Sequence, residues 1–261
     1  MLRAIVRPPA RNFAEGLTTC GHGVPVYEIA LEQHEVYCQA LQRCGLTLTR
    51  LEADPHYPDS TFVEDTAVLT EHRAIISRPG APSRVGETDE MRHVLAQFYS
   101  EVREIVEPGT LDGGDVCQAG VNSDHFFIGI SERTNEEGAR QLGRLLDDVG
   151  YTHAFVNIRH VSRAKGLLHL KSGLACLGDG RLVVIEELAK QESFRGFDLI
   201  PVAIGEEYAA NCVRVNDHVL LAAGYPVFAE KLSRLGYKTL SLDMSEFQKM
   251  DGGLSCLSLR F

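Results

Sequence analysis

The sequence has too few basic residues and too few long apolar runs for several classes of protein. Twenty-six lysines and arginines stand against 36 aspartates and glutamates, so the formal net charge is −10. A nucleic-acid-binding protein needs clustered basic residues to neutralise phosphates, and an anionic membrane surface needs the same positive charge. The longest apolar stretch, residues 219–229, is interrupted by Gly224 and Pro226 and falls well short of the ~18 residues that span a bilayer.

Cysteine spacings typical of metal sites and disulfides are also missing. The seven cysteines are odd in number and include no C-x-x-C pair, which argues against a disulfide framework and a structural zinc ribbon. Arg3, Arg7 and Arg11 interrupt the N-terminal region, so the apolar core of a signal peptide cannot form there. We therefore expect a cytoplasmic protein with no membrane and no nucleic-acid partner.

What remains is the composition of an ordinary soluble protein. The chain has 261 residues, of which 44% are hydrophobic and 24% charged. Because α/β architectures reach this length as one unit, we expect a single domain over residues 1–261. Apolar spacing predicts helices over residues 28–44, 90–99, 134–150 and 227–235. In the third helix, Thr134 and Glu137 have the spacing of a capping box.

Between these helices lie pairs of strand-like segments of similar design. Each pair has polar residues, an apolar strand, a turn rich in Gly, Asn or Asp, and a second strand. The pairs are residues 61–69 with 74–77, 116–119 with 125–130, 174–177 with 182–185, and 212–215 with 218–222. The polar residues at which the units begin are Asp59, Asp112, His169, Asn211 and Asp251, and they recur every 40 to 57 residues.

Such a period indicates stacked or radially arranged units. A closed ring would gather the polar residues around a central site. The last unit, residues 251–261, lacks a second strand, and residues 2–6 could supply it and close the ring. The alternative from spacing alone is an ordinary α/β sandwich.

Two side chains have the chemistry of a nucleophile and its acid–base partner. Cys256 follows Gly252-Gly253, a pair that permits an irregular backbone and could aim the thiol into a cleft. The alternative is a buried, inert thiol, which is how we interpret Cys176 and Cys212. His169 lies at the start of an apolar strand, and its ordinary pKa suits a general acid and base.

Carboxylates and two loop arginines indicate what such a site would bind. If the acids near the starts of the units converge, they form an anionic pocket that selects a cation. A guanidinium is the planar cation that carboxylates bind through two hydrogen bonds, although acids beside glycines are also common turn formers. Arg84 and Arg133 lie in loops. At the rim of an acidic pocket they would bind a carboxylate at the other end of the substrate.

Six segments, in order along nearly the whole chain, resemble the dimethylarginine dimethylaminohydrolases of the guanidine-modifying (pentein) superfamily. They are Phe62-Val-Glu-Asp65, Arg78-Pro-Gly-Ala-Pro-Ser-Arg84, Thr110-Leu-Asp-Gly-Gly-Asp115, Leu168-His-Leu-Lys171, Ala209-Ala-Asn-Cys212 and Asp251-Gly-Gly-Leu-Ser-Cys256. The resemblance implies a five-fold pseudosymmetric β/α propeller of ββαβ-type units. It also implies hydrolysis of methylated arginine to citrulline and a methylamine, through a covalent S-alkylthiouronium and without metal or organic cofactor.

The resemblance assigns roles to particular residues. Cys256 matches the nucleophile, His169 the general acid and base, and Asp112 the acid that orients the histidine. Asp65, with Glu64 beside it, matches the carboxylate that holds the guanidinium. The remaining substrate-binding positions are Asp59 with the backbone around Leu17 and Met250 for the α-amino group, and Arg84 and Arg133 for the α-carboxylate.

The sequence leaves other functions open. Arginine deiminases carry an acid two residues after the catalytic histidine, where this chain has Lys171, so methylated arginine is favoured over arginine. A non-catalytic propeller is a second alternative, against which the complete set of site residues weighs. Cys256 and His169 could also capture zinc, which we expect to inhibit rather than to assist. A homodimer is the default expectation, and residues 16–23, with three glycines, are the candidate lid.

Overall fold

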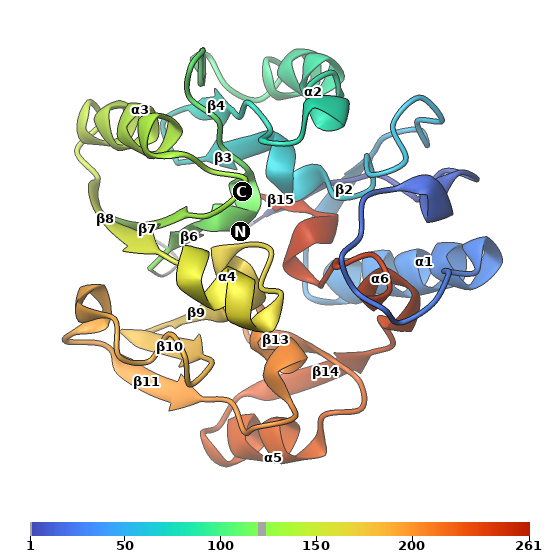
Figure 1. Ribbon diagram of the computed structural model, residues 1–261. Helices are drawn as coiled ribbons and strands as arrows, with labels where there is room; N and C mark the ends of the chain where they lie inside the picture. Colours follow the sequence, from blue (N-terminus) through green and yellow to red (C-terminus); the bar gives the residue numbers. More distant parts are fainter. Residues whose placement is uncertain (1, 120–123) are drawn as a thin grey trace.

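The described strands form a ring of five small sheets. The structure is a computed structural model that describes residues 2–119 and 124–261, with backbone alone for residues 163–165. Five three-stranded sheets surround a common centre (Figure 1). The predicted five-fold propeller is therefore confirmed, and the α/β sandwich is excluded.

All five sheets have one design. A short inner strand pairs antiparallel with a middle strand, which pairs parallel with an outer strand. The inner strands are β3 (Ala67–Leu69), β6 (Val116–Gln118), β9 (Leu174–Gly178), β12 (Val213–Val215) and β15 (Leu259–Arg260). The middle strands are β1 (Arg3–Val6), β4 (Ala74–Ile76), β7 (His125–Ile130), β10 (Arg181–Val184) and β13 (His218–Ala222). The outer strands are β2 (Thr47–Arg50), β5 (Val102–Glu104), β8 (Thr152–Asn157), β11 (Asp198–Pro201) and β14 (Lys238–Leu242).

Helices connect the middle strands to the outer ones. The connecting α-helices are α1 (Tyr27–Arg43), α2 (Glu87–Leu95), α3 (Glu136–Asp147) and α5 (Pro226–Arg234). In the remaining unit the 3-10 helix η6 (Glu192–Phe194) stands between β10 and β11 instead. Two shorter helices, α4 (Arg159–Lys165) and α6 (Ser245–Gln248), lie elsewhere in the chain. Among the described residues, no helix is long and apolar enough to cross a membrane.

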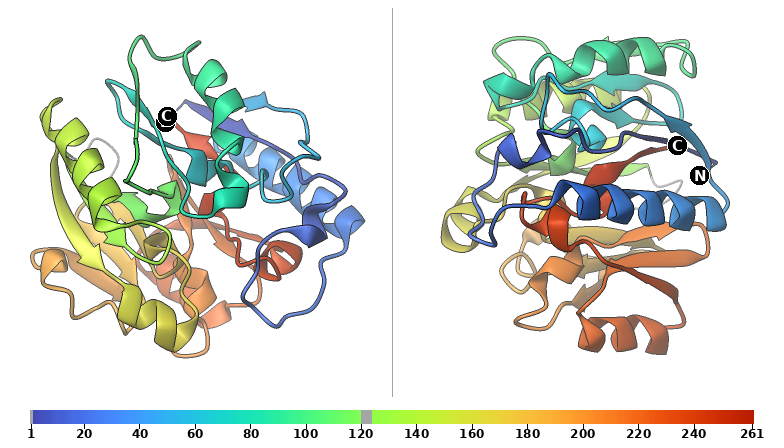
Figure 2. Two further views of the ribbon diagram at one scale, coloured as in Figure 1. Left: turned by 45° about the horizontal axis from the view of Figure 1, so that its top comes forward. Right: turned by 90° about the vertical axis from the view of Figure 1, so that its right-hand side faces the viewer.

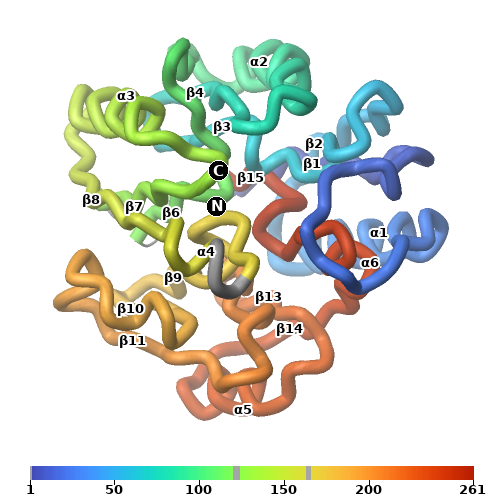
Figure 3. Tube along the Cα trace, viewed as in Figure 1, coloured from blue at the N-terminus to red at the C-terminus, as the bar shows by residue number. Residues whose placement is uncertain are grey.

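The two ends of the chain close the ring, as the sequence predicts. Strand β1 pairs antiparallel with β15, with Ala4 opposite Arg260 and Ile5 opposite Leu259. The amides of Leu2 and Arg3 both donate to the carbonyl of Phe261. The chain passes once round the ring in Figure 3, and in Figure 2 the two termini lie together. The first and last units of the sequence are thus one sheet.

The structure corrects three sequence predictions. First, the sequence predictions missed the five outer strands. Their residues are polar or half-exposed and do not alternate regularly between apolar and polar. Helix α2 begins and ends earlier than predicted. The N-cap of α3 is Asn135, whose side chain accepts from the amide of Gly138, and not Thr134. Thr134 instead uses its hydroxyl to accept from the amide of Asp112.

The apolar core lies between each sheet and its helix. In the third unit, Leu142 and Leu146 of α3 pack on Phe126 and Ile128 of β7 in one buried cluster. The same arrangement repeats around the ring, so the helices form its outer layer (Figure 1). The inner strands are left to line the centre.

A 3-10 turn precedes every inner strand. These turns are η2 (Val63–Thr66), η4 (Gly113–Asp115), η5 (Leu170–Ser172), η7 (Glu207–Ala210) and η8 (Ser255–Leu257). Because the units are related by the ring, the five turns come together at one end of its centre, where η2 contacts both η4 and η8 and η5 contacts η4 and η7. The polar residues that the sequence places at the starts of the units lie in or beside these turns.

Closure of the ring by β1 should contribute to the free energy of unfolding. Ile5 is fully buried on β1, whereas Ile204 is 83% exposed. We expect Ile5→Ala to lower the free energy of unfolding by about 2–5 kcal/mol, through lost burial and the cavity left behind. The matched variant Ile204→Ala should stay within about 0.5 kcal/mol of the unmodified protein. Urea unfolding measures both values, and equal midpoints for the two variants would contradict the closure.

Candidate functional site

Four of the 3-10 turns bring the candidate catalytic residues to one place. Asp65 belongs to η2 and Cys256 to η8, while Asp112 and His169 immediately precede η4 and η5. Each comes from a different unit of the ring. The four residues lie far apart in the sequence, and ring closure brings them together.

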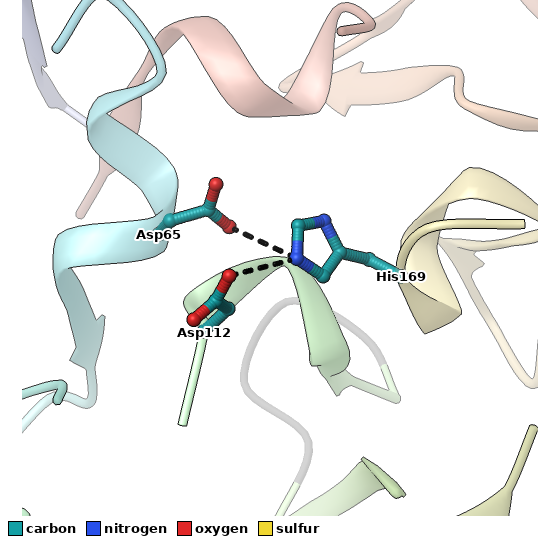
Figure 4. Close-up of side chains that lie close together, drawn as sticks. All are labelled: Asp65, Asp112 and His169. Atoms are coloured by element: carbon teal, nitrogen blue, oxygen red, sulfur yellow. Dashed lines mark hydrogen bonds and ion pairs between the residues drawn. The ribbon is translucent and has the colours of Figure 1, made fainter. Parts of the chain in front are cut away.

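One ring nitrogen of His169 faces two carboxylates (Figure 4). Its Nε2 is 3.0 Å from Oδ2 of Asp112 and 3.9 Å from Oδ1 of Asp65. Burial lowers the pKa of His169, but the charge of Asp65 and the hydrogen bond to Asp112 outweigh burial and raise the pKa to about 9. The imidazole is therefore mostly protonated at neutral pH and can donate a proton.

Asp65 is a buried carboxylate that stays ionised. Its Oδ2 accepts from Nη1 of Arg84 at 2.6 Å, and its Oδ1 accepts from the amide of Gly114 at 2.9 Å. Burial raises its pKa, but His169 and Arg84 together lower it to about 2. A β-carbon at Gly114 would lie 2.7 Å from Nδ1 of His169 and 2.8 Å from Oδ1 of Asp65, so the close approach requires glycine.

Asp112 and Asp115 hold the turns on which His169 depends. The second oxygen of Asp112, Oδ1, accepts from the amide of Gly80 at 2.8 Å. Asp115 accepts from the amide of Leu170, next to His169, at 2.9 Å and from the hydroxyl of Ser131 at 2.6 Å. We did not assign Asp115 to the site from the sequence, although it belongs to the same Asp-Gly-Gly-Asp segment.

The thiol of Cys256 is almost covered, with 8% of the residue exposed. Burial raises its pKa, and the negative charges of Glu64 and Asp65 raise it further, to about 12. Cys256 is therefore a thiol rather than a thiolate at neutral pH. A cation bound beside it would stabilise the thiolate.

A small pocket of about 20 Å³, the Cys256 pocket, contains most of the predicted site. Its lining residues are Leu17, Asp59, Phe62, Asp65, Arg84, Arg133, Leu168, His169, Met250, Asp251, Gly252 and Cys256. Phe62, Leu168, Asp251 and Gly252 were not assigned from the sequence, and they supply walls next to the motif residues. The pocket is much smaller than ligand pockets usually are.

The predicted carboxylate- and amino-binding groups lie at one part of this pocket. Asp59 is buried and accepts from the amide of Leu17 at 3.0 Å. Burial raises the pKa of Asp59, and Arg84 and Arg133 oppose that rise. The Arg84 guanidinium is engaged by Asp65 and Glu87. The Arg133 guanidinium donates no hydrogen bond to any described residue.

The candidate lid, residues 16–23, is tied to the segment before Cys256. The hydroxyl of Thr18 donates to the carbonyl of Lys249 at 2.9 Å, and the amide of Thr19 donates to Oδ2 of Asp251 at 2.5 Å. Asp251 has a left-handed backbone, with φ of 56°, which is uncommon outside glycine. These contacts join the segment to the residues just before Cys256, and Leu17 is its one member among the described residues that line the pocket. Its role as a lid stays a prediction.

Glu64 lies away from the Cys256 pocket, although it adjoins Asp65 in the sequence. It lines a larger cavity of about 160 Å³. One of its oxygens accepts from the hydroxyl of Ser255 at 2.7 Å, and the other contacts the ammonium of Lys171 at 2.7 Å. Lys171 lines the larger cavity as well. Neither residue lines the Cys256 pocket, and Glu64 contacts Ser255, the neighbour of Cys256.

Three buried groups have the geometry of a metal site. Ligand atoms of Asp65, Asp112 and His169 lie within 4.8 Å of one another. A divalent cation there would displace the proton that His169 shares with Asp112, so this set fits inhibition better than a structural site. Cys256 is not a member of this group, and the predicted zinc pair of Cys256 and His169 stays a prediction.

Comparison with known proteins assigns the family. Residues 24–200 match the family model described as "N,N dimethylarginine dimethylhydrolase, eukaryotic". An N(G),N(G)-dimethylarginine dimethylaminohydrolase of Pseudomonas aeruginosa is 45% identical over 258 residues, which is 98% of this chain and 98% of that protein. The chain belongs to the dimethylarginine dimethylaminohydrolase family.

Solved structures agree with this assignment. A Pseudomonas aeruginosa dimethylarginine dimethylaminohydrolase, a cysteine-to-serine mutant complexed with citrulline, superposes with a TM-score of 0.94 at 44% identity, covering 100% of this chain and 99% of that one. The N-terminal domain of the cyanobacterial arginine dihydrolase ArgZ has a TM-score of 0.86 at 19% identity, covering 99% of this chain and 97% of that one. This second likeness shows only that the fold is shared.

The hydrogen bond from His169 to Asp112 should contribute to the proton affinity of His169. We expect Asp112→Asn to lower the pKa of His169 by about one pH unit, because a neutral amide no longer favours the imidazolium. The folded-state pKa exceeds the ordinary 6.5, so the lost stability should be greatest below about pH 6.5 and shrink as the pH rises through about 9. Histidine NMR titration and urea unfolding at several pH values measure both effects.

The matched control for this experiment is Asp217→Asn, at a carboxylate whose side chain is 81% exposed. It should leave the His169 titration unchanged. An unaltered His169 pKa in the Asp112 variant would contradict the role given to the hydrogen bond.

Proposed function

We propose that this protein hydrolyses Nω-methylated arginines, both asymmetric dimethylarginine and monomethylarginine, to L-citrulline and dimethylamine or methylamine. The observation that carries the proposal is the convergence of Cys256, His169 and Asp65 on one pocket, in a chain of this family. A cysteine, a protonated imidazole and a buried carboxylate are the groups that this reaction needs. The bound citrulline of the related Pseudomonas structure is the product of the same chemistry.

Substrate binding uses the two ends of the pocket. Asp65 accepts hydrogen bonds from the substrate guanidinium, while Asp59 and the backbone near Leu17 and Met250 hold the α-amino group. Arg133, whose guanidinium has no hydrogen bond to a described residue, binds the α-carboxylate. Arg84 joins it there when the substrate cation replaces the Arg84 guanidinium at Asp65, since both are guanidinium groups that fit the same carboxylate.

The chemistry follows from the charges around Cys256. The substrate cation and protonated His169 stabilise the thiolate, so the Cys256 thiol loses its proton to solvent on substrate binding. The thiolate attacks the guanidine carbon and forms a tetrahedral adduct. His169 gives its proton to the departing methylamine or dimethylamine, and the carbon–nitrogen bond breaks. Neutral His169 then takes a proton from water, which attacks the S-alkylthiouronium. The carbon–sulfur bond breaks, and citrulline and the thiol are released.

Several sequence predictions are neither confirmed nor contradicted. They are the single-domain organisation, the homodimer, the cytoplasmic location, the lack of a nucleic-acid partner and the lack of a cofactor. The proposed steps use only side chains of this chain and water. Glu64, predicted to bind substrate, has no direct contact with the substrate in this account: it lies outside the Cys256 pocket and accepts a hydrogen bond from Ser255.

Replacement of the nucleophile should abolish turnover. We expect Cys256→Ser to lower citrulline release from asymmetric dimethylarginine by at least about a thousandfold, because the hydroxyl is a far poorer nucleophile here. Cys44→Ser, at another buried thiol that does not line the Cys256 pocket, is the control and should keep its activity. Faster turnover of arginine than of dimethylarginine would move the protein to the deiminases. Citrulline release that survives in the Cys256 variant would sink the mechanism.

The contact between the candidate lid and Asp59 should affect substrate binding. A β-carbon at Gly16 would lie 2.5 Å from Oδ1 of Asp59, whereas one at Gly21 meets nothing within 4 Å. We expect Gly16→Ala to raise KM about tenfold, because Asp59 shifts from the position that holds the α-amino group. Gly21→Ala should have the KM of the unmodified protein. Equal KM values for the two variants would contradict a role of the contact between Gly16 and Asp59 in substrate binding.

A further inference from the structure

The larger cavity lies on the axis of the ring and will be called the core cavity. Its volume is about 160 Å³, and all five inner strands contribute to its lining. The lining residues that carry the argument are Glu64, Lys171, Ala175, Cys176, Arg214 and Arg260. One water molecule needs only about 10–15 Å³ of such space, so a small polyatomic ion fits here together with water.

Positive charge exceeds negative charge in this lining. Lys171, Arg214 and Arg260 line the core cavity, and Glu64 is the carboxylate among its described lining residues. The same oxygen of Glu64 serves two cations, the ammonium of Lys171 at 2.7 Å and the guanidinium of Arg260 at 3.4 Å. One carboxylate therefore faces two largely buried cations.

Arg214 adds a third positive charge. Its ion pair with Asp179, at 3.1 Å, involves a carboxylate whose side chain is 75% exposed and is not among the residues lining the core cavity. The lining is thus positive in a chain whose formal net charge is −10. Uncompensated buried charge is costly, and a bound anion would offset that cost.

Some N–H groups of the lining cations also have no acceptor among the described residues. The Nε atom of Arg260 is buried and has no partner among the described residues. The ammonium of Lys171 has three N–H groups, and its contact within the described residues is the single carboxylate of Glu64. An anion with several oxygen acceptors would use these donors.

We propose that the core cavity binds a small tetrahedral oxyanion, of the class of inorganic phosphate and sulfate, between Lys171 and Arg260. The proposal does not depend on the hydrolase activity. The two cavities share their turns, because Glu64 adjoins Asp65 and Ser255 adjoins Cys256. A bound oxyanion adds negative charge behind Glu64, and it therefore disfavours the Cys256 thiolate.

Site-resolved thiol labelling tests the proposal in solution. Cys176 lines the core cavity and is half-buried, whereas Cys20 is a half-buried thiol in the candidate lid. The probes are sulfate and phosphate, each exchanged against chloride at constant ionic strength, with a small neutral thiosulfonate as the label. We expect each oxyanion to slow labelling of Cys176 saturably, about fivefold or more, through blocked access and a raised thiol pKa. Labelling of Cys20 should not change.

Substitutions in the lining test whether the protection of Cys176 arises from binding in the core cavity. Ala175→Leu fills part of the core cavity and should abolish the protection of Cys176, whereas Ala203→Leu, at an exposed alanine, should retain it. Lys171→Gln removes one cation and should also abolish the protection of Cys176. This second variant decides the test if Ala175→Leu misfolds. Protection of Cys256 without protection of Cys176 would mean binding at Arg84 and Arg133. Such protection of Cys256 alone would overturn the proposal. So would a labelling rate of Cys176 that the oxyanions leave unchanged, or protection of Cys176 in the Ala175→Leu variant equal to that in the unmodified protein.

Discussion

The ionised carboxylate of Asp65 is the interaction on which the site depends. A buried negative charge persists only beside compensating positive charge, and Arg84 and His169 supply it from two other segments. Asp65 in turn helps to raise the pKa of His169 to about 9. In the proposed mechanism this carboxylate keeps His169 protonated, and the substrate guanidinium takes the place that Arg84 occupies at Asp65 in this structure. Both effects require the turns η2, η4 and η5 to meet, which is what the closed ring provides.

In the proposed mechanism, burial and the same negative charges keep the nucleophile, Cys256, protonated until a cation binds. Glu64 and Asp65 reinforce burial in raising the pKa of Cys256 to about 12. A substrate guanidinium changes the sign of the local field, so binding and activation become one event. The Cys256 pocket has a volume of only about 20 Å³ in this structure.

The ring could be predicted from the sequence because six segments resemble one family in order, whereas the spacing of the units alone left an α/β sandwich open. The same segments supplied most of the candidate site residues. The outer strands could not be predicted, since they are half-exposed and their polar residues conceal the alternation. Glu64 shows a finer limit. Neighbouring side chains on a tight 3-10 turn point in different directions, so Asp65 faces the Cys256 pocket and Glu64 the core cavity. Because Glu64 and Asp65 are neighbours in the sequence, both were predicted to bind the substrate. In the structure they line two different cavities.

The central claim is that Cys256 is a thiol in the free protein and that a bound cation ionises it. Thiolate absorbance in the ultraviolet, taken as the difference between the protein and its Cys256→Ser variant, measures this directly across the pH range. The account predicts no thiolate signal from Cys256 at neutral pH. A signal should appear when L-lysine, whose side-chain cation has no guanidine carbon to hydrolyse, is added. A thiolate already present at neutral pH in the free protein, and unchanged by the cation, would contradict it.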